Sequence, residues 1–333
     1  MSTTTLEQAI HAQTPIILDG ALATYLETLG ADISGALWSA DILLKNPSLI
    51  KQAHLDYYRA GAQIAITASY QASLPGLVQH LGPGTVGEDE VKEVVRTSVR
   101  LAQQARDEYV AERTREGAGE TSTPPPQLWV AGSVGPYGAF LANGSEYRGD
   151  YELPIPAMQA FHRGRIAALV SAGADILALE TIPSKQETIA LLDLLRHEFP
   201  TTKAWFTFTL AGPDAIADGT PLAELVPLFR HEAQVLALGF NCVPDGVGLA
   251  AVKVLKTVLL EQGMARVGTV MYPNSGELWN ARAREWEGSR TEGGLLGEKT
   301  REWYAAGARL IGGCCRTTPG DIGVMREALE GFR

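Results

Sequence analysis

Eight short apolar runs, each followed by a longer segment with helical spacing, are the feature that most limits how this chain can fold. The runs are rich in β-branched and aromatic residues and are bounded by Gly, Pro, Asn and Asp, as expected of buried strands. They occupy residues 16–20, 63–70, 128–136, 175–182, 203–210, 235–242, 265–274 and 308–315. Helical spacing marks 47–60, 88–112, 155–172, 185–198, 222–232 and 246–262. This alternation predicts an α/β protein, a single (β/α)8 TIM barrel with a parallel sheet.

We expect residues 1–333 to form this one barrel domain. The polar, Pro-rich stretch 114–127 is predicted to be an exposed loop that leads into the third strand. Residues 274–297 follow the seventh strand and are long for a connection. Because long loops at the C-terminal face of a barrel often cover the substrate, we expect that role for 274–297.

The C-terminal ends of all strands in a barrel meet at one rim, where TIM-barrel enzymes have their active sites. The chemically unusual side chains of this sequence fall at those ends. They are Asp19, Thr67, Tyr70, Ser133, Glu180, Asn241, Cys242, Tyr272, Cys314 and Cys315. The sequence therefore predicts one rim that holds a metal, two carboxylates and several aromatic rings.

The three cysteines of the chain are Cys242 and the neighbouring pair Cys314 and Cys315. Three soft ligands without a fourth are the donor set of a catalytic zinc site, which keeps one position open for water or substrate. For Cys242 alone, a small buried apolar side chain is an equally good interpretation. Neighbouring cysteines rarely both face one core, and a disulfide between them would be strained. The pair therefore indicates metal or thiol chemistry, with Zn²⁺ as the expected cofactor.

Composition excludes several classes of function. A net charge of −10 without a basic cluster argues against nucleic-acid binding. The N-terminus lacks a basic start followed by an apolar stretch, and no run reaches the roughly 20 apolar residues of a membrane span. An odd number of cysteines does not indicate a disulfide framework. We expect a cytoplasmic protein that acts on small molecules, as a monomer or weak homodimer.

Several motifs together resemble the homocysteine S-methyltransferase family, over nearly the whole chain. They lie at 19–24, 37–39, 132–139, 146–151, 239–242 and 312–316, the last being Gly312-Gly313-Cys314-Cys315-Arg316. The resemblance implies a zinc-dependent barrel in which Cys242, Cys314 and Cys315 hold the metal and the thiol of homocysteine takes the open position. It also implies that Asp19 and Glu180 lie in the homocysteine pocket, where a carboxylate would pair with the ammonium group of the substrate. Both carboxylates also have a structural interpretation. Asp19 could cap the helix that starts near Ala21, and Glu180 could form a structural ion pair.

Further residues of the rim are candidates for binding the substrates. Ser133, Asn241 and Thr67 end strands beside the predicted metal, and backbone N–H groups of 132–135 would suit the carboxylate of homocysteine. Trp38 and Tyr70 would suit a cationic methyl donor through cation–π contact, although either ring could equally be part of the core. Transfer from a sulfonium needs no general acid, because the leaving group departs as a neutral thioether. We therefore expect none of the six histidines at the centre of the site.

The resemblance is compatible with three branches of the family, which use different methyl donors. Cobalamin-dependent relatives carry further domains, for which 333 residues leave no room. Betaine-using relatives typically have a second glycine where this chain has Ala21, and they extend beyond the barrel. The branch that uses S-methylmethionine, and often S-adenosylmethionine, fits better and shares the motif at 146–151.

Two functions of other classes remain open. A non-catalytic zinc or thiol sensor would leave Asp19 and Glu180 unexplained. A lyase or aldolase on the same barrel would want a lysine at the rim as Schiff base, and the strand ends contain none.

Overall fold

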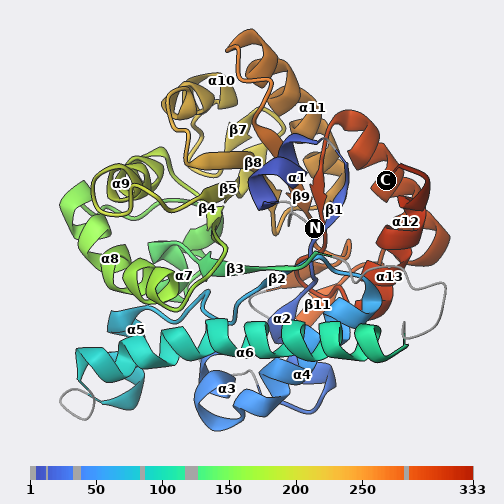
Figure 1. The fold of residues 1–333 in the computed structure, drawn as a ribbon. Coiled ribbons are helices and arrows are strands. Elements are labelled where there is room, and N and C mark those ends of the chain that lie inside the picture. Colours follow the sequence, from blue (N-terminus) through green and yellow to red (C-terminus); the bar gives the residue numbers. More distant parts are fainter. Residues whose placement is uncertain are drawn as a thin grey trace.

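The computed structural model describes residues 5–12, 14–32, 39–82, 87–116, 127–280 and 285–332. One sheet of eight strands has the order β1-β12-β9-β8-β5-β4-β3-β2, and its neighbouring strands pair in parallel. A parallel bridge between Leu18 and Ile64 joins the two edges of the sheet. The predicted (β/α)8 barrel is therefore confirmed, with helices arranged around the strands (Figure 1).

Each strand of the barrel lies inside one of the eight predicted runs. The strands are β1 (Ile16–Ile17), β2 (Ile64–Ile66), β3 (Trp129–Val134), β4 (Ile176–Ile182), β5 (Ala204–Phe208), β8 (Val235–Asn241), β9 (Gly268–Tyr272) and β12 (Leu310–Ile311). The predicted runs are longer because they include the polar residues at the strand ends, which form the rim.

The outer layer consists of helices that follow the strands in chain order. They are α2 (Leu22–Thr28), α3 (Ser39–Lys45), α4 (Pro47–Ala60), α5 (Leu74–Leu81), α6 (Glu88–Glu116), α7 (Tyr137–Leu141), η1 (Ser145–Tyr147), α8 (Ile155–Ser171), α9 (Lys185–His197), α10 (Leu222–Leu225), η2 (Val226–Phe229), α11 (Asp245–Glu261), α12 (Gly293–Ala306), α13 (Pro319–Ala328) and η3 (Glu330–Phe332). The helix predicted over 222–232 is a short α-turn followed by a 3₁₀ turn that contains Pro227, which has no N–H to donate.

The barrel interior is filled by alternate residues of the strands. Ile16 and Leu18 of the first strand point inward, while Ile17 packs outward against the helices. This period of two is what a pleated strand imposes. Trp205 is fully buried inside, and α1 (Leu6–His11) covers the N-terminal end of the barrel, where Figure 1 shows it across the strands. The interior is therefore a packed core, and chemistry is left to the opposite rim.

Two predicted loops show more regular structure than expected. Helix α6 continues to Glu116, so the first residues of the stretch 114–127 are helical, and 117–126 lie outside the described residues. The stretch 274–297 contains an antiparallel pair, β10 (Leu278–Asn280) and β11 (Glu285–Glu287), and it also includes the start of α12. A second small pair, β6 (Leu210–Gly212) and β7 (Ala215–Ile216), follows β5.

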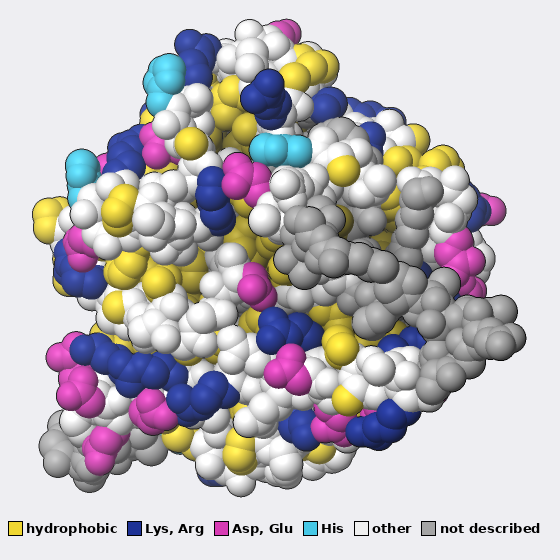
Figure 2. Space-filling view, viewed as in Figure 1, with side chains coloured by type: hydrophobic (Ala, Val, Ile, Leu, Met, Phe, Trp, Pro, Cys, Tyr) yellow, Lys and Arg dark blue, Asp and Glu magenta, His cyan; other side chains and the backbone are white. Residues whose placement is uncertain are grey.

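The surface carries charges of both signs. On the face shown in Figure 2, Lys and Arg side chains lie among Asp and Glu side chains, over α6 and around the helices above it. Among the helices that the structure describes, none is both long enough and apolar enough to cross a membrane.

Candidate active site and metal centre

The three cysteines meet at the C-terminal rim, although Cys242 and Cys314 are 72 residues apart in the sequence. Cys242 directly follows β8, and the pair Cys314 and Cys315 follows β12. The strand between them, β9, supports both loops. The N–H of Cys242 donates to Tyr272 O over 3.3 Å, and the N–H of Cys314 donates to Pro273 O over 2.8 Å. Strand order in the barrel therefore brings the third cysteine to the pair.

The sulfur atoms form a compact group in which all three Sγ atoms lie within 4.8 Å of one another. Cys242 and Cys314 are joined by a disulfide, whereas Cys315 is free, with its Sγ 3.9 Å from that of Cys242. The sequence had given no reason to expect a disulfide. The fold sets the Cα atoms of Cys242 and Cys314 5.5 Å apart, within the span of a disulfide. The neighbouring cysteines are not bonded to each other, as expected.

The cysteine group suits a metal ion once the disulfide is reduced. A tetrahedral ion with Zn–S bonds of about 2.3 Å holds its sulfurs about 3.8 Å apart, and the 3.9 Å between Cys242 and Cys315 meets that requirement. Burial raises the pKa of the Cys315 thiol to about 12, and Glu146 and Glu180 act in the same direction. A cation is therefore needed to keep this thiol ionised. The group that the described residues form has three ligands, which leaves one position for a substrate.

The backbone beside the cavity adopts the left-handed conformation that non-glycine residues avoid. Thr181, Cys242 and Arg316 have φ angles of 63°, 52° and 68°. The side chain of Asn241 holds the backbone of Thr181 in this conformation. Its Oδ1 accepts from the Thr181 N–H and its Nδ2 donates to Thr181 Oγ1, both over 2.8 Å. Thr24 Oγ1 accepts from the N–H of Arg316 over 3.0 Å. Such conformations cluster at functional sites and persist only where the surroundings fix them.

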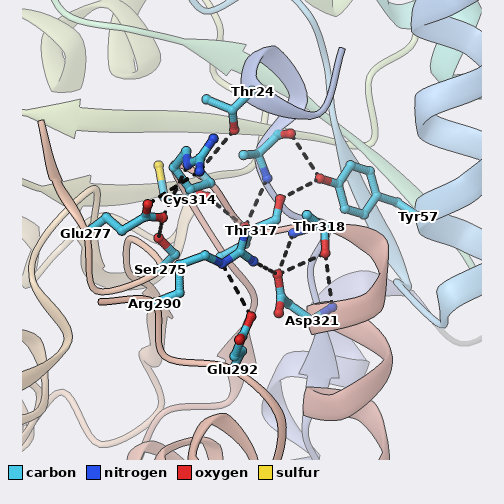
Figure 3. Close-up of polar contacts among 12 residues, drawn as sticks. Thr24, Tyr57, Ser275, Glu277, Arg290, Glu292, Cys314, Thr317, Thr318 and Asp321 are labelled. Carbon is cyan, nitrogen blue, oxygen red and sulfur yellow. Dashed lines mark hydrogen bonds and ion pairs between the residues drawn. The ribbon is translucent and has the colours of Figure 1, made fainter. Parts of the chain in front are cut away.

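The cysteine loop is tied to the start of α2 (Figure 3). Thr317 Oγ1 donates to Cys314 O over 2.7 Å and accepts from Ala21 N–H over 3.1 Å. The Tyr57 hydroxyl lies 2.9 Å from Ala21 O and 3.0 Å from Thr317 O, and it can donate to either. A Cβ atom on Gly313 would overlap the Thr317 side chain, so the glycine before the cysteine pair permits this packing.

The segment after β9 is bound to the other side of the same loop (Figure 3). Arg316 Nε donates to Glu277 Oε2 over 3.2 Å, and Ser275 Oγ donates to the same oxygen over 2.9 Å. Arg290 pairs with Asp321 in the first turn of α13 at 2.8 Å. The residues that follow the seventh strand thus help to fix the cysteine loop.

Glu180, at the end of β4, is a buried carboxylate that receives two hydroxyl donors. Ser133 Oγ donates to its Oε1, and Tyr272 OH donates to its Oε2 over 3.0 Å. Burial raises the pKa of Glu180 to about 7, although both hydroxyls and Arg165 favour the charged form. The hydrogen-bond partners of Glu180 are neutral hydroxyls, so the described contacts do not support the alternative of a structural ion pair. A cation that enters the cavity would find a carboxylate ready to ionise.

Asp19, which follows β1, is also a buried carboxylate. Its Oδ2 accepts from Ile66 N–H over 2.8 Å, while its Oδ1 is buried and has no hydrogen-bond partner in the part of the chain that the structure describes. Burial raises its pKa well above the usual value, and the charge of Glu180 adds to this. Asp19 does not cap α2, whose N-cap is Ala21. It is Gly20, the next residue, that lines the cavity.

One cavity collects most of the predicted side chains. Its lining includes Thr67, Tyr70, Ser133, Glu180, Asn241, Cys242, Cys314 and Cys315. Trp38 lies outside the described residues. The lining also includes Thr181, Tyr272, Glu146 and Tyr147. The sequence singled out the last two only as part of a motif, and Thr181 has no sequence signal beyond its place next to Glu180.

Thr67 and the backbone N–H of Ser133 were both predicted to bind substrate, but they hydrogen-bond to each other. Thr67 Oγ1 accepts from the N–H of Ser133 over 2.9 Å, so that N–H, which was expected to be free for a substrate carboxylate, is already used. Arg165, which is 1% exposed, donates to Tyr70 O over 2.7 Å and to Gly135 O over 2.5 Å. This buried cation links the segments that follow β2 and β3, and no pattern in the sequence had indicated it.

Comparison with known proteins identifies the family. The model of the family described as homocysteine S-methyltransferase matches residues 16–329. The homocysteine S-methyltransferase of Escherichia coli K12 is 46% identical over 321 residues, which cover 96% of this chain and 97% of that protein. Homocysteine S-methyltransferase YbgG of Bacillus subtilis is 42% identical over 307 residues, with 92% of each chain covered.

Solved structures agree with this result. The metallated form of the homocysteine methyltransferase MmuM from Escherichia coli has a TM-score of 0.80 at 45% identity, and the comparison covers 94% of this chain and 96% of that one. The oxidised form of the same enzyme also has a TM-score of 0.80, with 94% and 95% covered. Matches in sequence and in structure thus extend over nearly the whole barrel, and the chain belongs to the homocysteine S-methyltransferase family.

Proposed function

We propose that this chain transfers a methyl group from a sulfonium donor, S-methylmethionine or S-adenosylmethionine, to the thiol of L-homocysteine, and so forms methionine. The observation that carries the proposal is a single cavity that contains three cysteine sulfurs and the buried carboxylate of Glu180. The names of the relatives support the acceptor, and the metallated form of the Escherichia coli enzyme supports a metal.

Cys242, Cys314 and Cys315 would hold the metal, and we propose that it is Zn²⁺. Three thiolates with tetrahedral spacing are a donor set that zinc prefers. Bound there, the ion would lower the pKa of a thiol in its open position and so supply a thiolate acceptor at neutral pH. Because the ligands must be reduced, we also propose that the protein works in a reducing compartment such as the cytoplasm.

Glu180 is proposed to bind the ammonium group of homocysteine. Hydrogen bonds from Ser133 and Tyr272 fix the carboxylate, and an ammonium beside it would favour the ionised form. Asp19 is proposed to assist Glu180, since its Oδ1 atom has no hydrogen-bond partner among the described residues. Asn241 and Thr67 are proposed to act on the substrate mainly through the strand ends that they hold. Asn241 bonds to Thr181 of β4, and Thr67 bonds to Ser133 of β3.

The chemical step needs alignment more than proton transfer. The acceptor sulfur forms a bond to the methyl carbon, and the bond from that carbon to the donor sulfur breaks. The electron pair of the broken bond stays on the donor sulfur, which leaves as a neutral thioether. No proton moves, which agrees with a cavity lining that, among the described residues, contains no histidine. The protein must bind both molecules in line and exclude water.

The choice of a sulfonium donor rests on two features. Ala21 stands where betaine-using relatives typically have glycine, and the motif at 146–151 contributes Glu146 and Tyr147 to the cavity. Tyr70 also lines it and is proposed to face the cationic donor. We also propose that the single domain of residues 1–333 acts as a monomer or weak homodimer.

The test is methionine formation by reduced, zinc-loaded protein from homocysteine and each of four donors: S-methylmethionine, S-adenosylmethionine, betaine and methyltetrahydrofolate. We expect turnover with a sulfonium donor and none after Cys315→Ser, while the exposed Glu152→Gln variant keeps full activity. Turnover with betaine alone would overturn the choice of donor. A full equivalent of bound zinc without turnover on any donor would favour a sensor instead.

A further inference from the structure

Glu146 is a second carboxylate of the cavity and, unlike Glu180, it accepts no hydrogen bond from another side chain among the described contacts. It lies in η1, between β3 and α8, and lines the same cavity as the cysteines. Its Oε2 atom is buried and without a hydrogen-bond partner among the residues described here. Burial raises the pKa of Glu146, and its charge is felt at Tyr70 and Cys315.

The cation nearest in sequence, Arg148, favours the charged form of Glu146 and lowers its pKa, but none of the described hydrogen bonds joins the two side chains. Arg148 donates to Asp150 over 2.7 Å, and its two other described contacts are with Asn143 O and Ser145 Oγ, each at 3.3 Å. A carboxylate oxygen that is buried without a hydrogen-bond partner is costly, and proteins keep one where a ligand completes it. Glu146 can therefore pair with a ligand in the cavity that carries a positive or hydrogen-donating group.

The backbone of Glu146 is held firmly in place. Thr209 Oγ1 donates to Glu146 O over 2.9 Å. A Cβ atom on Gly138 would lie 2.6 Å from the Glu146 nitrogen, so α7 approaches this turn as closely as only glycine allows. Tyr151, at the end of the motif, donates to the fully buried Glu187, which also accepts from the Tyr137 N–H over 2.7 Å. A carboxylate on such a fixed turn can select a ligand by position.

From this arrangement we infer that Glu146 binds the α-ammonium group of the methyl donor. The inference rests on the proposed function and adds a residue that determines donor specificity. Glu180, at the strand end and with two hydroxyl donors, suits the acceptor. Glu146 sits on a turn whose next residue, Tyr147, is 46% exposed, so this part of the cavity lining is closer to the surface than Glu180, which is 7% exposed.

The donor carries two positive groups, the sulfonium and the α-ammonium. The change of charge during the reaction indicates which of the two Glu146 contacts. The sulfonium loses its positive charge as the methyl group leaves, so an anion in contact with it would stabilise the bound donor more than the transition state. The ammonium group keeps its charge throughout. A carboxylate there improves binding and orientation without raising the barrier, while an aromatic ring such as Tyr70 or Tyr147 suffices for the sulfonium.

The test compares wild type, Glu146→Gln and the control Glu152→Gln, an exposed carboxylate six residues further on. Binding of S-methylmethionine is measured by titration calorimetry, and initial rates are measured with each substrate varied in turn. For Glu146→Gln we expect a rise of about 10- to 100-fold in both the Kd and the KM of S-methylmethionine, the usual effect of a hydrogen bond to a charged group. We expect kcat and the KM of homocysteine to change less than about threefold. With trimethylsulfonium, a donor without an ammonium group, the two proteins should have similar kcat/KM.

Other outcomes would overturn the inference. An unchanged Kd for S-methylmethionine would remove Glu146 from donor binding, and a higher KM for homocysteine would assign it to the acceptor. An equal loss with trimethylsulfonium would place it at the sulfonium. If the wild type binds S-methylmethionine without turnover, the proposed function fails and the two Kd values still decide the inference. If the wild type neither binds nor uses any sulfonium, both fail.

Discussion

Replacing Glu180 by glutamine should stabilise the protein at alkaline pH while it abolishes efficient catalysis. The side chain is 7% exposed, and its pKa is about 7 in the fold against 4.5 for an ordinary glutamate. An acid whose pKa is raised by folding binds its proton more tightly in the folded state. Its contribution is therefore most favourable below about pH 4.5 and is lost as the pH rises to about 7. At about 1.4 kcal/mol for each pH unit, the ionised form costs about 3 kcal/mol above pH 7.

The glutamine variant avoids this cost, since an amide has the same shape and no charge. Part of the gain is lost because only the oxygen of the amide accepts a hydrogen bond, so either Ser133 or Tyr272 loses its acceptor, at about 1–2 kcal/mol. We expect the free energy of unfolding of reduced, zinc-free Glu180→Gln to exceed that of wild type by about 1–2 kcal/mol at pH 8.

The assay is urea denaturation of both proteins at pH 5 and pH 8, with Glu152→Gln as the control for removal of an exposed carboxylate. Removing the charge of Glu180 also lowers the raised pKa of Asp19, which favours the variant at pH 8 in the same direction. At pH 5 the difference should disappear or reverse. A difference that is the same at both pH values would refute the reasoning, as would a variant that is less stable than wild type at pH 8. The same variant should raise the KM of homocysteine at least tenfold, because the proposed partner of its ammonium group is gone.

Three further predictions concern the metal centre and its supports. Cys315→Ser should bind less than about a tenth of an equivalent of zinc after reduction, as measured by mass spectrometry, and a full equivalent would contradict the three-sulfur site. Asn241→Ala removes both hydrogen bonds to Thr181 and should lower the free energy of unfolding by about 2–4 kcal/mol; a loss below 1 kcal/mol in denaturant titrations would show that the left-handed backbone needs no such support. Gly313→Ala should weaken zinc binding at least tenfold in competition with a chelator, because the added methyl group collides with Thr317, and an unchanged affinity would mean that the loop adjusts freely.

The oxidised state of the cysteines shows how the fold changes what a count of residues suggests. Three cysteines in a chain of 333 residues gave no indication of a disulfide, and the neighbouring pair is indeed unbonded. The bond between Cys242 and Cys314 arises because β8 and β12 flank β9 in the barrel. The same proximity brings three sulfurs together for a metal, so the disulfide and the metal site compete for the same atoms. Reduction is therefore the first condition of metal loading.

The sequence by itself determined the barrel, because hydrophobic periodicity is a local property that the chain carries in every strand and helix. It also determined which side chains reach the rim, since a residue such as Cys242 or Glu180 stands at the end of an apolar run whatever its partners are. What it did not reveal are the partners. Ser133 and Tyr272 meet Glu180 across 47 and 92 residues of sequence, and no local pattern encodes such a contact.

Only the tertiary structure decided which polar groups are satisfied and which are left for substrates. Asn241 and Glu146 look alike in the sequence, as polar residues near strand ends and loops. Asn241 bonds to Thr181 with both its amide atoms, whereas the Oε2 atom of Glu146 has no partner in the described part of the chain. The physical reason is that hydrogen bonds act over about 3 Å and depend on strand register and loop conformation. Hydrophobic burial, which needs only the right face, is readable from sequence spacing.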